Sequence, residues 1–212
     1  GSGKTTLCNL IARFWDVSEG SVTVGGVDVR KLDYADLMKH ISIVFQDTNL
    51  FKMSVAENVA MYKPGASREE IMEVLRQAQC EDILEKLPNG VDSVIGARGV
   101  YLSGGEMQRI ALARAILKDA PIVLLDEATA FADAENEYLI QRALDILLHG
   151  KTVLMIAHRL QTIVHADQII VMQRGGIAEQ GTHEELMQRQ GVYAKMYHEY
   201  ENSISWKIGG RA

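Results

Sequence analysis

Residues 122–127 read Ile-Val-Leu-Leu-Asp-Glu. Four consecutive apolar residues are typical of a strand that is buried on both faces of a sheet, and two acids, Asp126 and Glu127, follow it directly. Open α/β sheets bind ligands at the carboxyl ends of their strands, so this position makes both acids candidate functional residues. Taken alone, the pair is also consistent with two solvated acids that end a strand.

Similar apolar runs occur on either side of this stretch. Residues 41–45, 152–156 and 168–172 are predicted to be strands, and residues 135–148 have the spacing of a helix. Strands that alternate with helices predict an α/β fold whose parallel sheet is covered on both faces. A polar helix is predicted over residues 182–200.

The other segments complete a single domain over residues 1–212. Residues 21–29 alternate between apolar and polar around two central glycines, which predicts an antiparallel β-hairpin. We expect an α/β core made of residues 1–51 and 120–212. A mostly helical subdomain, at approximately 52–119, is expected to be inserted between the two parts of the core.

The chain opens with Gly-Ser-Gly-Lys-Thr-Thr. The third to fifth of these residues match the second half of the phosphate-binding pattern G-x-x-x-x-G-K-[ST]. In that loop, backbone N–H groups at a helix start surround phosphate oxygens, the lysine reaches the β- and γ-phosphates, and the hydroxyl ligates Mg²⁺. For this half-motif alone, a Gly/Ser turn that caps a helix beside a solvated lysine is an equal alternative. The residues assigned to phosphate contact are Gly1, Ser2, Gly3, Lys4, Thr5 and Thr6.

The phosphate-binding half-motif and the two acids support each other. With a Gly-Lys-Thr upstream, Asp126 and Thr5 are the expected Mg²⁺ ligands, and Glu127 is the candidate general base for an attacking water. The first glycine of the pattern would lie before residue 1. We therefore expect the chain to be truncated at its N-terminus.

A third motif is Leu-Ser-Gly-Gly-Glu at residues 102–106, and its Ser103 lies 23 residues before Asp126. Ser103 is a predicted helix N-cap, and Gly104 and Gly105 would let backbone amides approach an anion closely at the helix start. An ordinary helix cap is the alternative for Ser-Gly-Gly alone. Its place in the order of the motifs favours a functional role, and Glu106 is included in the predicted site.

In these motifs the chain resembles the ATP-binding cassette (ABC) family, and the resemblance covers essentially the whole chain. Leu-Ser-Gly-Gly-Glu is similar to the signature of that family. The resemblance implies a P-loop NTPase core of the RecA-like type with an inserted helical subdomain, and it implies ATP and Mg²⁺ as ligands. It also implies ATP hydrolysis that powers the movement of a substrate across a membrane.

Three more residues match family positions. Gln46 resembles the Q-loop glutamine, which approaches magnesium and the attacking water. Asp133 resembles the D-loop aspartate near the bound ATP, which communicates between two subunits. His158 resembles the switch histidine, which contacts the γ-phosphate. Each residue type is common in solvated loops or helix caps, so these roles rest on the joint order of the motifs.

Residues 49–59 and 99–103 resemble exporters within the family. This resemblance implies a second ABC ATPase domain as partner, in a homodimer or a heterodimer. It also implies a transmembrane domain, fused upstream, that holds the ATPase at the cytoplasmic face of the plasma membrane. Residues 130–137 further resemble half-transporters that handle siderophores.

Composition argues against one class of partner. The chain has 212 residues and a formal net charge of −6, with its basic residues scattered along the sequence. Binding to a phosphate backbone needs a concentrated basic face, so we expect no nucleic-acid partner.

Two rival functions remain open at this point. The first is a soluble, non-transport ABC ATPase that acts on ribosomes or DNA. Chromosome-organising members insert long coiled coils between the loop lysine and the signature, whereas Lys4 and Ser103 are only 99 positions apart. The second rival, a generic P-loop kinase, leaves the Ser-Gly-Gly motif without a role.

Overall fold

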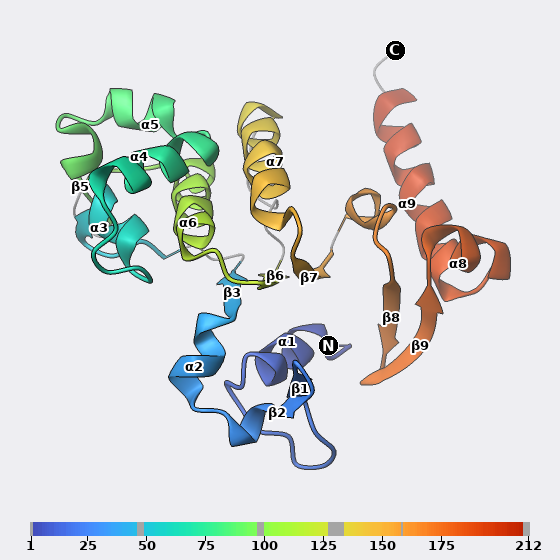
Figure 1. Cartoon of the computed structure of the whole chain (residues 1–212). Helices are drawn as coiled ribbons and strands as arrows, with labels where there is room; N and C mark the ends of the chain where they lie inside the picture. Colours follow the sequence, from blue (N-terminus) through green and yellow to red (C-terminus); the bar gives the residue numbers. More distant parts are fainter. Residues whose placement is uncertain (1, 46–48, 97–99, 127–133, 158, 210–212) are drawn as a thin grey trace. The chain divides into compact units, whose positions relative to one another are not determined.

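The computed structural model describes residues 2–45, 49–96, 100–126, 134–157 and 159–209 (Figure 1). The chain divides into two compact units. One is Ala12–Met155, which we term the central unit, and the other joins Gly1–Ile11 to Ile156–Ala212, which we term the terminal unit. The predicted division into a core and a helical subdomain follows motifs rather than compactness, and it stays a prediction.

The central unit contains the predicted sheet, with strand order β3-β6-β7. Strands β3 (Ile41–Val44) and β6 (Ile122–Asp126) are parallel, and Ile41 pairs with Ile122 and Val44 with Leu125. Strand β7 is Thr152–Ile156. Buried side chains along β6 explain why its sequence is continuously apolar rather than alternating.

Helices pack against this sheet and against one another. The central helix α6 (Gly104–Lys118) contacts α3 (Val55–Ala60), α4 (Arg68–Gln77), α7 (Ala134–Leu148) and strand β3. Helix α5 (Glu81–Lys86) completes the helical region that Figure 1 draws in green. Ile110, Leu112 and Ala113 of α6 are fully buried, and each buried Leu or Ile side chain contributes about 1.5 to 3 kcal/mol to stability.

The same N-terminal cap begins several of these helices. In α3, α4 and α6 a serine oxygen accepts from the third backbone N–H, while the glutamate at that position accepts from the N–H of the serine. Helix α8 (His183–Arg189) uses Thr182 in the same way. The reciprocal bonds satisfy donors that a helix start otherwise leaves unpaired, which explains why these helices begin where they do.

The predicted hairpin is confirmed. Strands β1 (Thr23–Val24) and β2 (Val27–Asp28) pair antiparallel, and Gly25 and Gly26 connect them with φ angles of 58° and 80°. Both central residues of such a two-residue turn need positive φ, which glycine adopts without steric cost.

Smaller elements complete the central unit. A second antiparallel pair joins β4 (Met53–Ser54) to β5 (Val94–Ile95). The remaining elements are the 3-10 turn η1 (Val29–Lys31), helix α2 (Tyr34–Lys39) and the 3-10 turn η2 (Gly90–Asp92).

The terminal unit consists of α1 (Lys4–Ile11), η3 (Leu160–Ile163), β8 (Ile169–Gln173), β9 (Gly176–Gly181), α8 and α9 (Val192–Gly209). Its core contains Ile169, Val171, Leu186 and Tyr193. The predicted strand at 168–172 corresponds to β8, but β8 pairs antiparallel with β9, which the sequence analysis does not predict. The ladder pairs Ile170 with Gln180 and Val171 with Glu179, and its register shifts between Val171 and Met172.

The single helix predicted over 182–200 is wrong, because the chain forms two helices there. Gln190 ends α8 in the left-handed region at φ 52°, and Gly191 follows it. The carboxylate of Glu179 on β9 accepts from the N–H groups of Val192 and Tyr193, at 2.8 and 2.9 Å. This carboxylate caps the start of α9 as a separate helix. It also fills the space that a Cβ on residue 191 would need.

Within the described residues, no helix has both the length and the apolar character needed to cross a membrane.

Candidate functional site

The predicted phosphate loop forms the start of helix α1. Gly3 has a φ angle of +95°, and its carbonyl accepts the first helical hydrogen bond, from the N–H of Leu7 at 3.0 Å. The amides of Lys4, Thr5 and Thr6 precede that bond, so they point out of the N-terminal end of the helix. A Cβ on Gly3 would meet its neighbours at ordinary distances of 3.5 Å or more, so the backbone angle, and not space, requires glycine here.

Two side chains of the loop are placed for polar contact. The Lys4 ammonium group donates to the Ser2 hydroxyl at 3.1 Å and is half-buried, whereas Thr5 and Thr6 are exposed. A helix N-terminus with outward amides and an adjacent ammonium group favours an anion. The predicted residues Ser2, Gly3, Lys4, Thr5 and Thr6 therefore lie together in the terminal unit.

Asp126 is the last residue of β6 and is half-buried. The two residues before it are almost completely buried, which fixes the strand and leaves the aspartate at its carboxyl end. Because Val44 pairs with Leu125, Phe45 follows β3 at the same sheet edge as Asp126.

Ser103 is the N-cap of α6, as the sequence predicts. Its backbone N–H donates to Glu106 Oε2 at 2.8 Å, and its hydroxyl oxygen accepts from the Glu106 N–H at 3.3 Å. Gly104 is exposed at the first turn. Glu106 is engaged in the cap itself, so its contact with ATP stays a prediction.

Gly105 has a packing role that the sequence analysis does not identify. A Cβ at this position would lie 2.8 Å from the side-chain carbon Cγ of Asn136 on α7. Such a distance is shorter than van der Waals contact allows, so glycine lets α6 and α7 approach each other closely. The predicted role, in which the second glycine opens space for an anion, stays a prediction beside this packing role.

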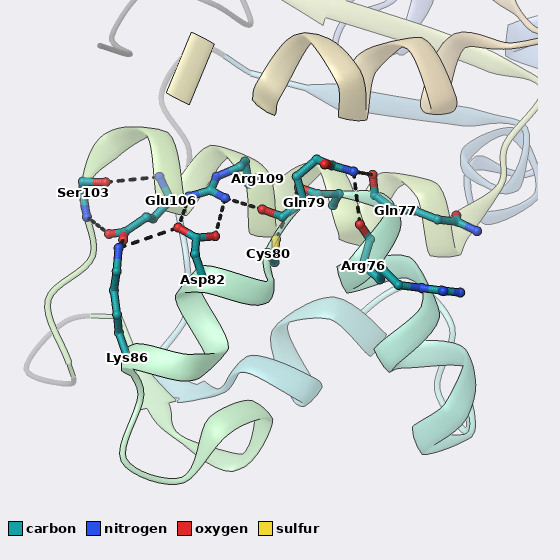
Figure 2. A network of polar contacts seen from close by, with 10 residues as sticks. Arg76, Gln77, Gln79, Cys80, Asp82, Lys86, Ser103, Glu106 and Arg109 are labelled. Carbon is teal, nitrogen blue, oxygen red and sulfur yellow. Dashed lines mark hydrogen bonds and ion pairs between the residues drawn. The ribbon is translucent and has the colours of Figure 1, made fainter. Parts of the chain in front are cut away.

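Four charged side chains connect α5 to the start of α6, and sequence reasoning missed three of them (Figure 2). The guanidinium of Arg109 forms a bidentate pair with Asp82, at 2.6 and 2.9 Å, and also donates to the Gln79 carbonyl. Lys86 lies 3.1 Å from Glu106 Oε1 and 3.6 Å from Asp82 Oδ2. Arg109 is 1% exposed, and its Nε has no hydrogen-bond partner among the residues that the structure describes.

The charges of this group determine how its acids titrate. Partial burial acts to raise the pKa of Glu106, but the N–H of Ser103 and the Lys86 ammonium group outweigh it, and the pKa is lowered. The hydrogen bonds from Arg109 lower the pKa of Asp82. Both acids are therefore ionised at neutral pH. Only Glu106 has a local sequence signal, since Ser-x-x-Glu before an apolar run is the capping-box pattern.

Five predicted residues lie outside the described part of the chain. They are Gly1, Gln46, Glu127, Asp133 and His158. The loop residues belong to the terminal unit, while Asp126 and residues 103–106 belong to the central unit. The geometry of the loop residues is therefore described within the terminal unit, and that of Asp126 and residues 103–106 within the central unit.

The donor atoms of the predicted metal ligands suit Mg²⁺. Thr5 offers a hydroxyl oxygen and Asp126 a carboxylate, and hard oxygen ligands of this kind suit Mg²⁺ together with phosphate oxygens and water. In the described ranges no three His, Cys, Asp or Glu side chains cluster into a metal site of their own.

Comparison with known proteins identifies relatives of this sequence and fold. The family profile described as "ABC transporter" matches residues 1–130. An ATP-dependent lipid A-core flippase of Legionella pneumophila is 49% identical over 93% of this chain and 34% of its own length. The mycobactin import ATP-binding/permease protein IrtA of Mycolicibacterium smegmatis is 52% identical over 93% of this chain and 23% of its own.

A solved structure supports the same relationship. The structure of a bacterial Atm1-family ABC exporter with ATP bound matches with a TM-score of 0.86 and 39% identity. The match covers 93% of this chain and 35% of that one. The chain thus spans about a third or less of the length of the relatives it matches. Since the family profile covers more than half of it, the chain belongs to the ABC transporter family, as an exporter-type ATPase domain.

Proposed function

We propose that this chain binds ATP with Mg²⁺ and hydrolyses it to drive transport across a membrane. The observation that supports this most is the start of α1, where a positive-φ glycine, outward amides and the Lys4 ammonium group meet. An anion site of this form fits the phosphates of a nucleotide. Family membership makes that nucleotide ATP.

Within this proposal, the described residues hold the nucleotide and its metal. Lys4 contacts the β- and γ-phosphates, and the amides of Thr5 and Thr6 surround them. The Thr5 hydroxyl and the Asp126 carboxylate are the proposed metal ligands. Magnesium, when bound, supplies charge neutralisation for the phosphate oxygens.

Three further residues are proposed to act on the attacking water and the γ-phosphate. Glu127 follows the Asp126 strand end and accepts a proton from the water. Gln46 follows Phe45 in the sequence, just after β3, and is proposed to approach the metal and the water. His158 contacts the γ-phosphate.

Ser103 is proposed to serve the ATP of a second ABC ATPase domain. The start of α6 favours an anion through its dipole and the exposed Gly104. In a head-to-tail pair, residues 103–105 of one domain close over the γ-phosphate held by Lys4 of the other, and Asp133 lies near this junction. ATP then joins the two domains, and hydrolysis releases them.

The relatives support the proposed partner domains and location. Two of them are named a flippase and a permease, and a third is an exporter. We therefore propose a transmembrane domain fused upstream and a place at the cytoplasmic face of the plasma membrane. The D-loop resemblance makes a siderophore the proposed substrate class, although the names of the relatives differ between lipid A-core and mycobactin. These names do not favour the rival function at ribosomes or DNA.

Replacing Lys4 with Ala in the intact protein is expected to weaken ATP binding by about 10- to 100-fold, because a charge-assisted contact to phosphate is lost. Titration with a fluorescent ATP analogue measures the change. Lys31→Ala, at an exposed lysine of the η1 turn, is the control and is expected to bind normally. Equal affinities for the two variants would show that the start of α1 is not the phosphate site.

Two copies of the intact protein are linked, one with Lys4→Ala and the other with Ser103→Arg. This mixed dimer is expected to hydrolyse ATP well above the two matched dimers, which carry Lys4→Ala or Ser103→Arg in both copies. Both lesions fall in the same composite site, so the other site of each linked dimer stays intact. Measured turnover of the mixed and matched pairs gives the result. If Ser103 served the ATP of its own chain, both sites of the mixed dimer would be damaged. Its turnover would then stay at the level of the matched dimers.

A further inference from the structure

The start of α6 carries a negative charge at the helix end that the proposed function brings to a phosphate. Glu106 is the third residue of α6, within its first turn, and its carboxylate accepts from the Ser103 N–H. Its side chain is only 14% exposed, so water screens it poorly. A carboxylate at this point strengthens the helix cap, but it opposes a second anion at the same helix end.

Lys86 offsets this charge from the neighbouring helix. Its ammonium group lies 3.1 Å from Glu106 Oε1, while the other oxygen, Oε2, is occupied by the Ser103 N–H. Figure 2 shows the lysine extending from the end of α5 toward the glutamate at the start of α6. Glu106 in turn raises the pKa of Lys86, so the lysine stays charged at neutral pH.

Lys86 is held near Glu106 by a second acid. Asp82 lies one turn earlier on α5, 3.6 Å from the Lys86 ammonium group, and it is anchored by the bidentate pair with the buried Arg109. The charges therefore alternate from Arg109 through Asp82 and Lys86 to Glu106. Glu106 in turn accepts from the N–H of Ser103, the residue that the proposed function brings to the γ-phosphate.

We propose that Lys86 is a positioning residue that compensates the charge of Glu106, so that the α6 start at Ser103 can accept the γ-phosphate of ATP held by a second domain. The inference rests on the proposed function. Lys86 touches neither ATP nor the reacting atoms, and it acts through Glu106. A rival explanation is that Lys86 only fastens α5 to α6, in which case its loss would lower thermal stability and leave the apparent affinity for ATP unchanged.

The test measures ATPase kinetics and thermal stability of the intact protein. Lys86→Met is expected to raise KM for ATP about fivefold, with a smaller change in kcat and a Tm close to wild type. The effect should shrink at high salt, because mobile ions then screen the uncompensated carboxylate. Lys86→Arg retains the positive charge and is expected to restore the wild-type KM.

A double variant separates the two possible roles of Lys86, which are compensation of the Glu106 charge and attachment of α5 to α6. Glu106→Gln keeps a capping side chain without the charge, so Lys86→Met should have no further effect on KM when Glu106→Gln is already present. Lys63→Met is the matched control, because it breaks an exposed pair with Glu70 elsewhere in the central unit. It is expected to leave KM unchanged.

Two results would overturn the inference. One is a KM for Lys86→Met equal to that of Lys63→Met, and the other is a double variant whose KM exceeds that of Glu106→Gln by the same fivefold. Failure of the proposed function looks different: the wild-type protein would not hydrolyse ATP, or Ser103→Arg would retain full turnover. An active wild type that is sensitive to Ser103→Arg therefore isolates the role of Lys86.

Discussion

Glu127→Gln in the intact protein is expected to lower ATP turnover by about 100- to 10,000-fold, which is the range for loss of a general base. The amide has nearly the same shape as the carboxylate, but it cannot accept a proton from the attacking water. ATP binding is expected to stay near wild type, because the carboxylate acts on the water in the transition state and not on the bound nucleotide.

Two measurements on the same preparation separate the effects. Single-turnover hydrolysis reports the chemical step, and equilibrium titration with ATP reports binding. Glu69→Gln, at an exposed acid in the first turn of α4, is the control for loss of one negative charge and is expected to retain turnover. Near-normal hydrolysis by Glu127→Gln, with normal affinity, would mean that another residue is the base.

Asp82→Ala is expected to destabilise the central unit by about 3 kcal/mol, which corresponds to a Tm lower by about 6 to 12 °C. The guanidinium of Arg109 is 1% exposed, and without this acid it keeps the Gln79 carbonyl as its hydrogen-bond partner among the described residues. A buried charge without its partner is costly because the low-dielectric interior replaces the lost hydration poorly.

Asp92→Ala provides a closely matched comparison. Asp92 also forms a bidentate pair, with Arg68 at 3.0 and 2.8 Å, but both side chains are more than half exposed. Its removal is expected to cost less than about 1 kcal/mol, since water solvates the freed arginine. Thermal unfolding of the two variants gives the comparison, and equal losses of Tm would contradict the importance of burial at Arg109.

Local patterns were enough to predict several features of this protein. The apolar run before Asp126 predicted the buried strand β6, and the paired glycines at 25–26 predicted the β1–β2 hairpin. The Ser103 cap at the start of α6 also follows from neighbouring residues alone. Each of these signals acts over a few residues, through side-chain periodicity, turn geometry or a cap, and it is therefore visible in the sequence.

Contacts between residues that are distant in the sequence decided other features of the structure. Glu179 restarts a helix at Val192, Asn136 requires glycine at position 105, and Arg109 pairs with Asp82 across 27 positions of sequence. None of these partners has a fixed spacing, because each pair meets only after separate strands and helices have packed together. By itself, the sequence determined the order of the nucleotide-binding motifs and the type of the elements that carry them. The tertiary structure decided which charges surround the start of α6, because burial and proximity there depend on how α5 packs against α6.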